Sequence, residues 1–261
     1  MSLGKGRGIV LSRKLSGEAD YICSIFTKES GREIFIFKGL RKSKKRSPSA
    51  SESGTVLDLN YYAREGVPLR TVSRFDIVSI PSEIKKSAEK IFALYYIFEI
   101  ADKTTGCGDA DKGIYNLLAS ALKGLSKAEE VINFTLFFII QYLKIQGILP
   151  QFSECSSCGD PDFRSYSLTA KNLKILCPCC CSREDKVLHR SSLDFLKLSI
   201  KEKYSSIDHS RFPYENMTGL LNVLTDFIEQ YFSITVKSKD MLLNSPPRSN
   251  SSKSSTACLP V

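Results

Sequence analysis

The sequence predicts an α+β protein in which a five-stranded β-barrel precedes an all-helical domain with an inserted four-cysteine zinc motif. Three observations support this. Short apolar and aromatic runs fill the first third, helical periodicity dominates after Pro81, and four cysteines occur as two close pairs. We expect a barrel over residues 1–80, helices over 81–150 and 186–240, the zinc-binding insertion over 151–185, and a disordered tail over 241–261.

The strands of the first third are separated by turn residues such as Ser16-Gly17-Glu18 and Ser30-Gly31. The expected strands are Gly8–Leu15, Tyr21–Phe26, Glu33–Phe37, Thr55–Tyr62 and Arg70–Ile80. Five short strands within about 80 residues are typical of the OB-fold. The third strand is almost continuously apolar, which indicates burial on both faces, or one buried face with exposed aromatic side chains.

The helical part is expected to begin with Ser82 as an N-cap and to pack one apolar face, on which Tyr95 and Phe98 lie. Ser126 with Glu129 resembles a capping box for a later helix. The expected helices are one from Ser82, then Asp111–Lys123 closed by Gly124, Ser126–Gln146, Ser191–Tyr204 and Thr218–Phe232. Residues 134–140 are apolar nearly all round, so we place that helix at the centre of the core.

The four-cysteine motif consists of Cys155 with Cys158 and Cys177 with Cys180, separated by 18 residues. This spacing matches zinc sites in which each pair supplies two thiolates from one tight turn. The intervening residues can form a hairpin, and Gly159 suits the turn because glycine tolerates a positive φ. Four cysteines leave no open coordination position, so the expected Zn²⁺ is structural. Two alternatives stay open: Cys179 or Cys181 in place of Cys180, and reduced cysteines without metal.

Positive charge is concentrated at the N-terminal end. Residues 1–80 hold 15 Lys and Arg against 8 Asp and Glu, whereas residues 81–240 hold 20 of each. This segregation favours a polyanion-binding module attached to a neutral body, because lysines that served only general solubility would not need to be concentrated in one part of the chain.

The strongest cluster of charge is the segment Lys38–Ser49, expected to be a mobile loop in which Pro48 ends local order. Candidate nucleic-acid ligands lie in it and on the nearby strands: Arg7, Arg13, Arg32, Lys38, Arg41, Lys42, Lys44, Lys45 and Arg46. Aromatic residues on the same strands could stack on bases, although most are expected in the core: Tyr21, Phe26, Phe35 and Phe37. A solvated linker is the alternative interpretation of the loop.

Catalytic motifs are not found. The histidines His189 and His209 adjoin no nucleophile motif, and the glycines before Gly8 precede a strand instead of following one, so they do not form a phosphate loop. We therefore expect a protein that is not an enzyme. The start of the chain has no apolar signal segment, and residues 134–140 are too short to span a bilayer, so no membrane association is expected. The cysteine usage indicates a reducing, cytosolic compartment.

Several segments resemble the RecO family of bacterial DNA repair and recombination mediators. They are Gly8-Ile9-Val10-Leu11, Gly17-Glu18-Ala19-Asp20, Phe26-Thr27, Gly31-Arg32, the run Lys38–Lys44, Gly147-Ile148-Leu149-Pro150 and Cys155 to Gly159. In order and spacing the resemblance covers roughly residues 8–181. The sequence departs from the family pattern in its polar extension after residue 243 and in its adjacent cysteines at 179–181.

The resemblance implies an OB-fold, a helical domain and an inserted zinc motif. It implies binding to single- and double-stranded DNA, annealing of complementary strands without a nucleotide, and help in loading RecA onto single strands coated with single-strand binding protein. The implied partners are RecR and the acidic C-terminal tail of single-strand binding protein, and the implied location is cytoplasmic and nucleoid-associated. Two other functions stay open: an RNA-binding or translation-associated protein with a zinc ribbon, and a zinc-dependent hydrolase.

Overall fold

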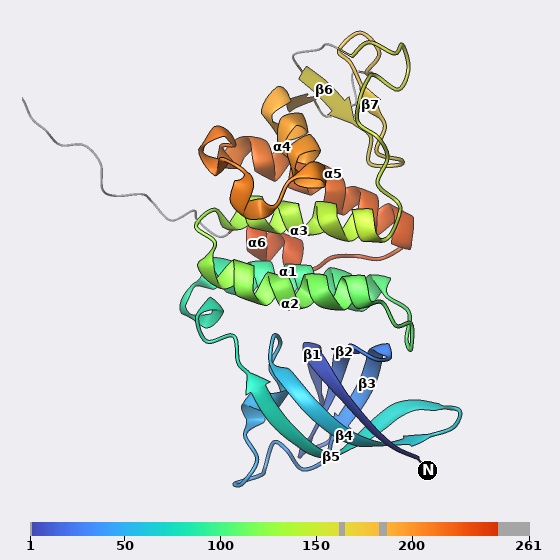
Figure 1. Ribbon diagram of the computed structural model, residues 1–261, viewed down its shortest axis with the longest axis vertical. Coiled ribbons are helices and arrows are strands. Elements are labelled where there is room, and N and C mark those ends of the chain that lie inside the picture. The colour runs from blue at the N-terminus through green and yellow to red at the C-terminus, as the bar shows by residue number, and fades with distance from the viewer. Residues whose placement is uncertain (1, 162–164, 183–186, 245–261) are drawn as a thin grey trace, which may run out of the picture.

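The computed structural model describes residues 2–161, 165–182 and 187–244. Three layers follow one another along its longest axis (Figure 1). A β-barrel occupies one end, a bundle of helices the middle, and a small sheet with the cysteine motif the other end. The expected disordered tail falls almost entirely outside the described residues.

The barrel is closed, with the strand order β1-β2-β3-β5-β4. Its strands are β1 (Ser2–Ser16), β2 (Asp20–Thr27), β3 (Gly31–Phe37), β4 (Val56–Arg64) and β5 (Val67–Ser79). All neighbours are antiparallel except β3 and β5, which pair in parallel over Ile34–Ile36. Five strands and this order confirm the predicted OB-fold-like barrel.

The third strand alternates in burial. Phe35 and Phe37 are fully buried inside the barrel, whereas Ile34 and Ile36 face outward and are half-buried. The expectation of exposed aromatic side chains on β3 is therefore wrong. In β1, by contrast, both faces are buried: Val10 belongs to the barrel core, while Ile9 and Leu11 pack into the core of the helical domain.

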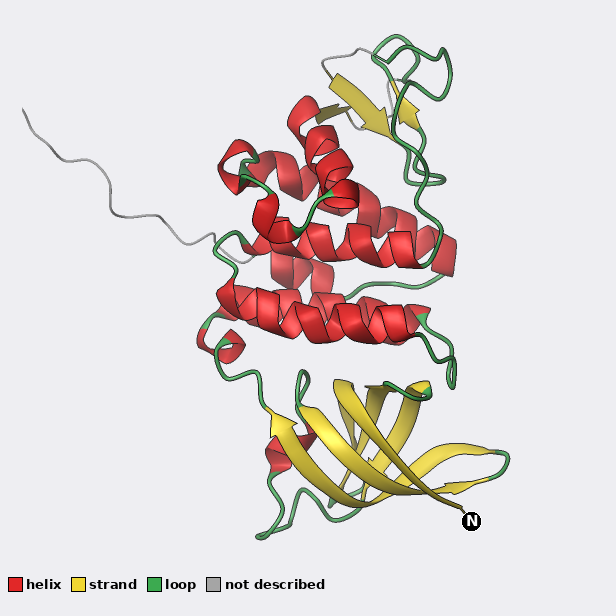
Figure 2. Cartoon of the chain, in the orientation of Figure 1, coloured by secondary structure: helices red, strands yellow, loops and turns green. Residues whose placement is uncertain are grey.

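The helical part contains α1 (Ala88–Thr104), α2 (Lys112–Lys127), α3 (Val131–Ile145), α4 (Arg190–Lys201), α5 (Tyr214–Phe232) and α6 (Ser238–Leu243). Figure 2 shows these helices stacked above the barrel. Helix α3 is buried on almost every side and lies at the centre of the core, as predicted. Among the described residues, no helix combines the length and apolarity needed to cross a membrane.

Three expected helix ends are wrong. Helix α1 follows a short 3-10 turn, η2 (Ile84–Lys86), and its N-cap is Ser87 instead of Ser82. Ser126 lies in the last turn of α2 and donates its hydroxyl to the Lys123 carbonyl, so it caps nothing. Gly124 does not end α2; a Cβ there would come within 2.5 Å of the Phe134 ring, so glycine permits close packing against α3.

The barrel is fastened to α1 by a polar network. The Asp102 carboxylate accepts hydrogen bonds from Ser12 Oγ at 2.7 Å and from Ser24 Oγ at 2.5 Å. Arg32 donates Nε to the Thr105 carbonyl at 2.9 Å and lies 3.6 Å from Asp102. These contacts join residues that are 70 to 90 positions apart, and they fix the barrel against the helical domain.

The start of β3 packs closely against the segment that follows α1. Gly31 has a φ of +67°, and a Cβ at this position would lie 1.8 Å from the Asp109 carbonyl oxygen. Only glycine fits there without a backbone shift, because any larger residue meets both the positive φ and the carbonyl.

Candidate nucleic-acid interface and metal centre

The four predicted cysteines form one cluster. The sulfur atoms of Cys155, Cys158, Cys177 and Cys180 all lie within 4.8 Å of one another. Cys155 and Cys177 are buried, Cys180 is half-buried and Cys158 is exposed. The choice of Cys180 over its two neighbours agrees with this grouping, since among the described residues neither Cys179 nor Cys181 joins the cluster. Cys181 instead donates its thiol to the Pro178 carbonyl at 3.4 Å.

Local backbone structure explains why the pairs meet. Strands β6 (Ser165–Leu168) and β7 (Ile175–Leu176) form the expected antiparallel hairpin, and β8 (Val187–His189) adds a third strand. In the first pair, Gly159 has a φ of +77° and donates its N–H to the Cys155 carbonyl at 2.9 Å. In the second, Cys180 N–H donates to the Cys177 carbonyl at 3.0 Å. Each pair is thus a tight turn that presents two thiols.

The cluster has the dimensions of a tetrahedral metal site. The sulfurs of Cys158 and Cys177 are 3.7 Å apart, and a tetrahedron with metal–sulfur bonds of about 2.3 Å separates its sulfurs by about 3.8 Å. Burial opposes ionisation of Cys155, but hydrogen bonds from backbone N–H groups, first among them that of Cys177, lower the pKa of this thiol to about 6. Hydrogen bonding with the neighbouring thiols, first that of Cys158, instead raises the pKa of Cys180. By the spacing of their sulfurs the four cysteines can hold a metal ion.

The basic loop after β3 is more ordered than the sequence indicates. Leu40 is fully buried in the barrel core, Arg41 N–H donates to the Ala19 carbonyl at 3.0 Å, and Gly39 N–H donates to Asp20 Oδ1 at 2.7 Å. Pro48 does not end local order; it begins a 3-10 helix, η1 (Pro48–Ser51), whose N-cap is Ser47. The expected end of local order at Pro48 is therefore wrong, and Leu40 with the turn hydrogen bonds holds the loop on the turn between β1 and β2.

The cationic side chains of the loop differ in whether they already have a partner within the protein. Lys42 forms an exposed ion pair with Glu18 at 2.7 Å, and Arg46 donates Nη2 to the Lys38 carbonyl at 2.5 Å. Arg41, Lys44 and Lys45 are exposed and have no carboxylate partner among the described residues. Lys38 is likewise exposed and has no carboxylate partner among the described residues, so the loop presents at least four uncompensated positive charges on a fixed backbone.

The three candidate arginines on the barrel strands already contact other residues of the fold. Arg7 forms a two-pronged pair with Asp58, with Nε and Nη2 at 2.7 and 2.8 Å from the carboxylate oxygens. This hydrogen bonding holds the pKa of the Asp58 carboxyl below its ordinary value. Arg32 lies in the interface with α1, as described above. Arg13 donates to Ser51 Oγ at 3.1 Å and covers the Tyr21 ring at 5.1 Å, with no carboxylate partner among the described residues.

Most of the aromatic residues considered for base stacking are in the core. Phe26, Phe35 and Phe37 have no exposed surface. Tyr21 is half-buried, and its ring faces Arg13. The two histidines have structural partners: His189 Nδ1 accepts from the Ser191 N–H at the start of α4, and His209 packs on the Tyr204 ring at 4.1 Å.

Comparison with known proteins agrees with this architecture. The family model described as "Recombination protein O N terminal" matches residues 1–81, and the one described as "Recombination protein O C terminal" matches residues 85–240. Curated relatives called DNA repair protein RecO are similar over most of the chain. The protein of a Thermoanaerobacter species is 25% identical over 94% of this chain and 98% of its own length.

Other bacteria supply similar relatives. The protein of Caldanaerobacter subterraneus is 24% identical over 92% of this chain and 97% of its own length. That of Streptomyces griseus is 30% identical over 62% of this chain and 68% of its own length. Both family models match in order and together span the barrel and the helical domain. The chain therefore belongs to the recombination protein O family, a family of DNA repair and recombination proteins.

Proposed function

We propose that the protein is a DNA-binding recombination mediator that anneals complementary strands. In this role it also helps to load RecA onto single strands coated with single-strand binding protein, during repair of gaps and breaks. The observation that carries the proposal is the ordered basic loop, whose Arg41, Lys44 and Lys45 project three uncompensated charges from the barrel. Membership in a family of DNA repair proteins supports DNA as the polyanion.

Strand annealing follows from neutralisation of phosphate charge. Two complementary strands repel each other, and cations bound to both lower that repulsion while releasing condensed counterions. Because the loop backbone is already fixed by Leu40 and by hydrogen bonds to Ala19 and Asp20, binding costs little ordering entropy there. The remaining candidate contacts are Arg7, Arg13, Arg32, Lys38, Lys42 and Arg46. Among the three strand arginines, Arg13 is the most available, since Arg7 and Arg32 already have carboxylate partners.

We propose Zn²⁺ as the metal of the cysteine cluster, held by Cys155, Cys158, Cys177 and Cys180. Zinc is the usual metal for four thiolates at this spacing, and when bound it supplies a closed structural cross-link. The strands β6, β7 and β8 are short, so such a cross-link would stabilise the sheet that they form. The cluster lies at the opposite end of the molecule from the barrel (Figure 1), which suits a scaffold role better than a contact with DNA.

The proposed partners are RecR, the C-terminal tail of single-strand binding protein and, indirectly, RecA. We propose that the protein acts without catalysing a reaction of its own, in the cytoplasm at the nucleoid, because these partners work on chromosomal DNA.

RecA loading tests the proposal directly. RecA filament assembly would be followed on gapped DNA coated with single-strand binding protein, with RecR present, and with or without this protein. The expected result is faster assembly with the wild-type protein and little gain with a variant in which Arg41, Lys44 and Lys45 are changed to alanine. Equal rates with and without the protein would contradict the mediator role. Competition between single-stranded DNA and RNA of one sequence separates it from an RNA-binding function, which tighter RNA binding would favour.

A further inference from the structure

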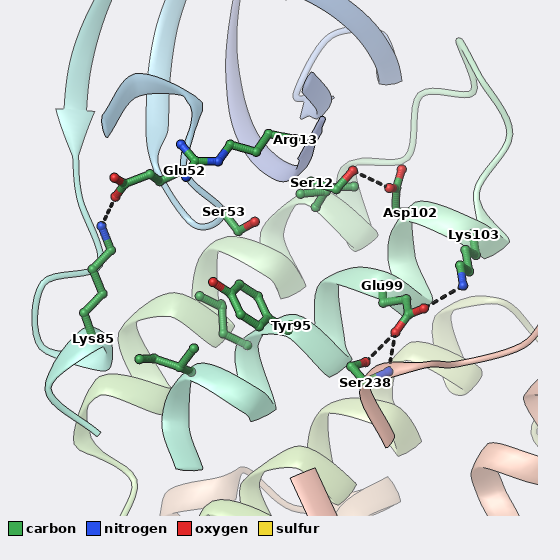
Figure 3. Close-up of a pocket in the computed structure, with 13 residues that line it drawn as sticks. Ser12, Arg13, Glu52, Ser53, Lys85, Tyr95, Glu99, Asp102, Lys103 and Ser238 are labelled. Atoms are coloured by element: carbon green, nitrogen blue, oxygen red, sulfur yellow. Dashed lines mark hydrogen bonds and ion pairs between the residues drawn. The ribbon is translucent and has the colours of Figure 1, made fainter. Parts of the chain in front are cut away.

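A cavity of about 870 Å³ lies where the barrel meets the helical domain. Its barrel side is formed by β1 and the residues after η1, and its helical side by α1 and the start of α6 (Figure 3). Sites for small ligands have volumes of about 300–1,000 Å³, so the cavity is large enough for unpaired nucleotides and too small for a double helix.

The acidic residues on the cavity wall are neutralised within the protein. Glu52 is paired with Lys85, and Glu99 with Lys103 at 2.6 Å. Asp102 accepts hydrogen bonds from Ser12 and Ser24 and lies near Arg32, as described above. Of the residues lining the cavity, all of which are described, Arg13 alone carries a charge without a carboxylate partner. The cavity therefore favours a ligand with one anionic group near Arg13.

The aromatic side chain of Tyr95 forms part of the opposite wall. It is 44% exposed, although it sits in the middle of α1 among buried residues. Its hydroxyl has no hydrogen-bond partner within the described part of the chain. Figure 3 shows Tyr95 pointing from α1 toward the barrel side, where Arg13 and Ser53 lie. The cavity is also lined by apolar side chains, those of Leu11, Ile91 and Leu94.

Arg13 connects the cavity to the basic loop. Its guanidinium binds Ser51 in η1, the short helix that follows the loop. Strand β1 continues from Arg13 through Lys14 to the turn on which the loop is anchored by Ala19. Arg13 and Lys14 thus place two exposed cations on β1 between the cavity and the turn that anchors the loop.

We propose that this cavity binds unpaired nucleotides of single-stranded DNA, with a base stacked on Tyr95 and a phosphate at Arg13. The inference rests on the proposed DNA-binding function and gives it a specific site. Stacking on an aromatic ring tolerates every base, because each base has a π-face, and a guanidinium matches the geometry of a phosphate. A duplex keeps its bases stacked inside, so it cannot use Tyr95. The cavity thus lets the protein distinguish unpaired from paired DNA, while the loop binds both.

The test uses the full-length protein and short single strands that carry one 2-aminopurine, whose fluorescence reports stacking. The variants are Tyr95→Ala, Tyr95→Phe and, as a matched control, Tyr231→Ala, which removes another exposed tyrosine of the helical domain. Affinity for the single strand and for the same sequence as a duplex is measured for each. Thermal unfolding checks that the variants are folded.

Tyr95→Ala is expected to weaken single-strand binding at least about 5-fold and to abolish the 2-aminopurine signal. Its duplex affinity is expected to match wild type, and Tyr95→Phe and Tyr231→Ala are expected to behave as wild type in both assays. Single-strand affinity and fluorescence unchanged in Tyr95→Ala would overturn the inference while leaving the proposed function in place. A wild-type protein that bound neither form of DNA would overturn both.

Discussion

The salt dependence of DNA binding is the most quantitative consequence of the basic loop. In a variant with Arg41, Lys44 and Lys45 changed to alanine, three of the uncompensated loop charges are removed. Lys42 and Arg46 are retained, because they already have partners in the protein. Each contact to a phosphate of a single strand contributes about 0.7 to the slope of log affinity against log salt. Three lost contacts should therefore flatten the slope by about 2.

The expected difference is large enough to measure. Between 50 and 200 mM salt, a slope difference of about 2 means that wild-type affinity falls roughly 20-fold more than that of the variant. Fluorescence anisotropy with a labelled oligonucleotide at four or five salt concentrations gives both slopes. The charge-matched control changes Lys112, Lys171 and Lys203, three exposed lysines outside the barrel, to alanine. It has the same net charge as the loop variant.

Equal slopes for wild type and loop variant would refute the assignment of phosphate contacts to the loop. A slope that flattened equally in the control would show that net charge, and not position, governs binding. Only a flattening confined to the loop variant agrees with a localised contact. Because the loop residues are exposed, unfolding midpoints in urea should be nearly the same for all three proteins.

Three further predictions concern the metal, the interface and pH. The Cys180→Ser variant should lose bound zinc by elemental analysis whereas Cys179→Ser retains it; equal zinc content in both would contradict the ligand assignment. Gly31→Ala should lower the free energy of unfolding, measured by urea titration, by at least about 2 kcal/mol, because the added methyl group meets a backbone carbonyl and the φ is positive. Gly17→Ala has a similar φ but open space around it, so it should lower the free energy of unfolding by only about 1 kcal/mol. Burial alone would raise the pKa of the Glu99 carboxyl, but hydrogen bonds from α1 and α6 hold it below its ordinary value. The ionised Glu99 carboxyl therefore stabilises the fold fully at pH values above its pKa in the unfolded chain, and this stabilisation is lost as the pH falls through its pKa in the folded protein. The melting temperature of Glu99→Gln should consequently drop less on acidification than that of the wild type.

The cysteine site was predictable because its determinants are local. Each pair is a single turn, and the hairpin between them spans few residues, so spacing alone brought Cys155 and Cys177 together. The barrel strands were predictable for a similar reason, since alternation and turn residues mark them. The first half of β1 was missed because glycine and charged residues have low strand propensity. It forms because residues 2–9 pair with β4, and Gly4 gives room for the Tyr61 ring.

The interface between barrel and helices could not be predicted. Ser12 and Ser24 meet Asp102 across 90 and 78 positions, and no sequence pattern links hydroxyls to a carboxylate at such distances. For the same reason Arg32 looked like a nucleic-acid ligand, whereas the structure places it in this interface. Tyr95 matched the apolar face of its helix by spacing, yet 44% of its surface is exposed at the cavity. Such residues acquire their surroundings only from the packing of two domains.

Strand annealing without nucleotide is the measurement that tests the central claim most directly. Two complementary oligonucleotides, one carrying a fluorophore and the other a quencher, would be mixed with full-length protein, with and without single-strand binding protein. The wild-type protein should accelerate annealing in both conditions, and the loop variant lacking Arg41, Lys44 and Lys45 should lose most of the acceleration while the Lys112, Lys171 and Lys203 control keeps it. Annealing at the spontaneous rate with wild type, or full acceleration with the loop variant, would contradict the claim that the barrel's fixed cationic loop acts on DNA strands.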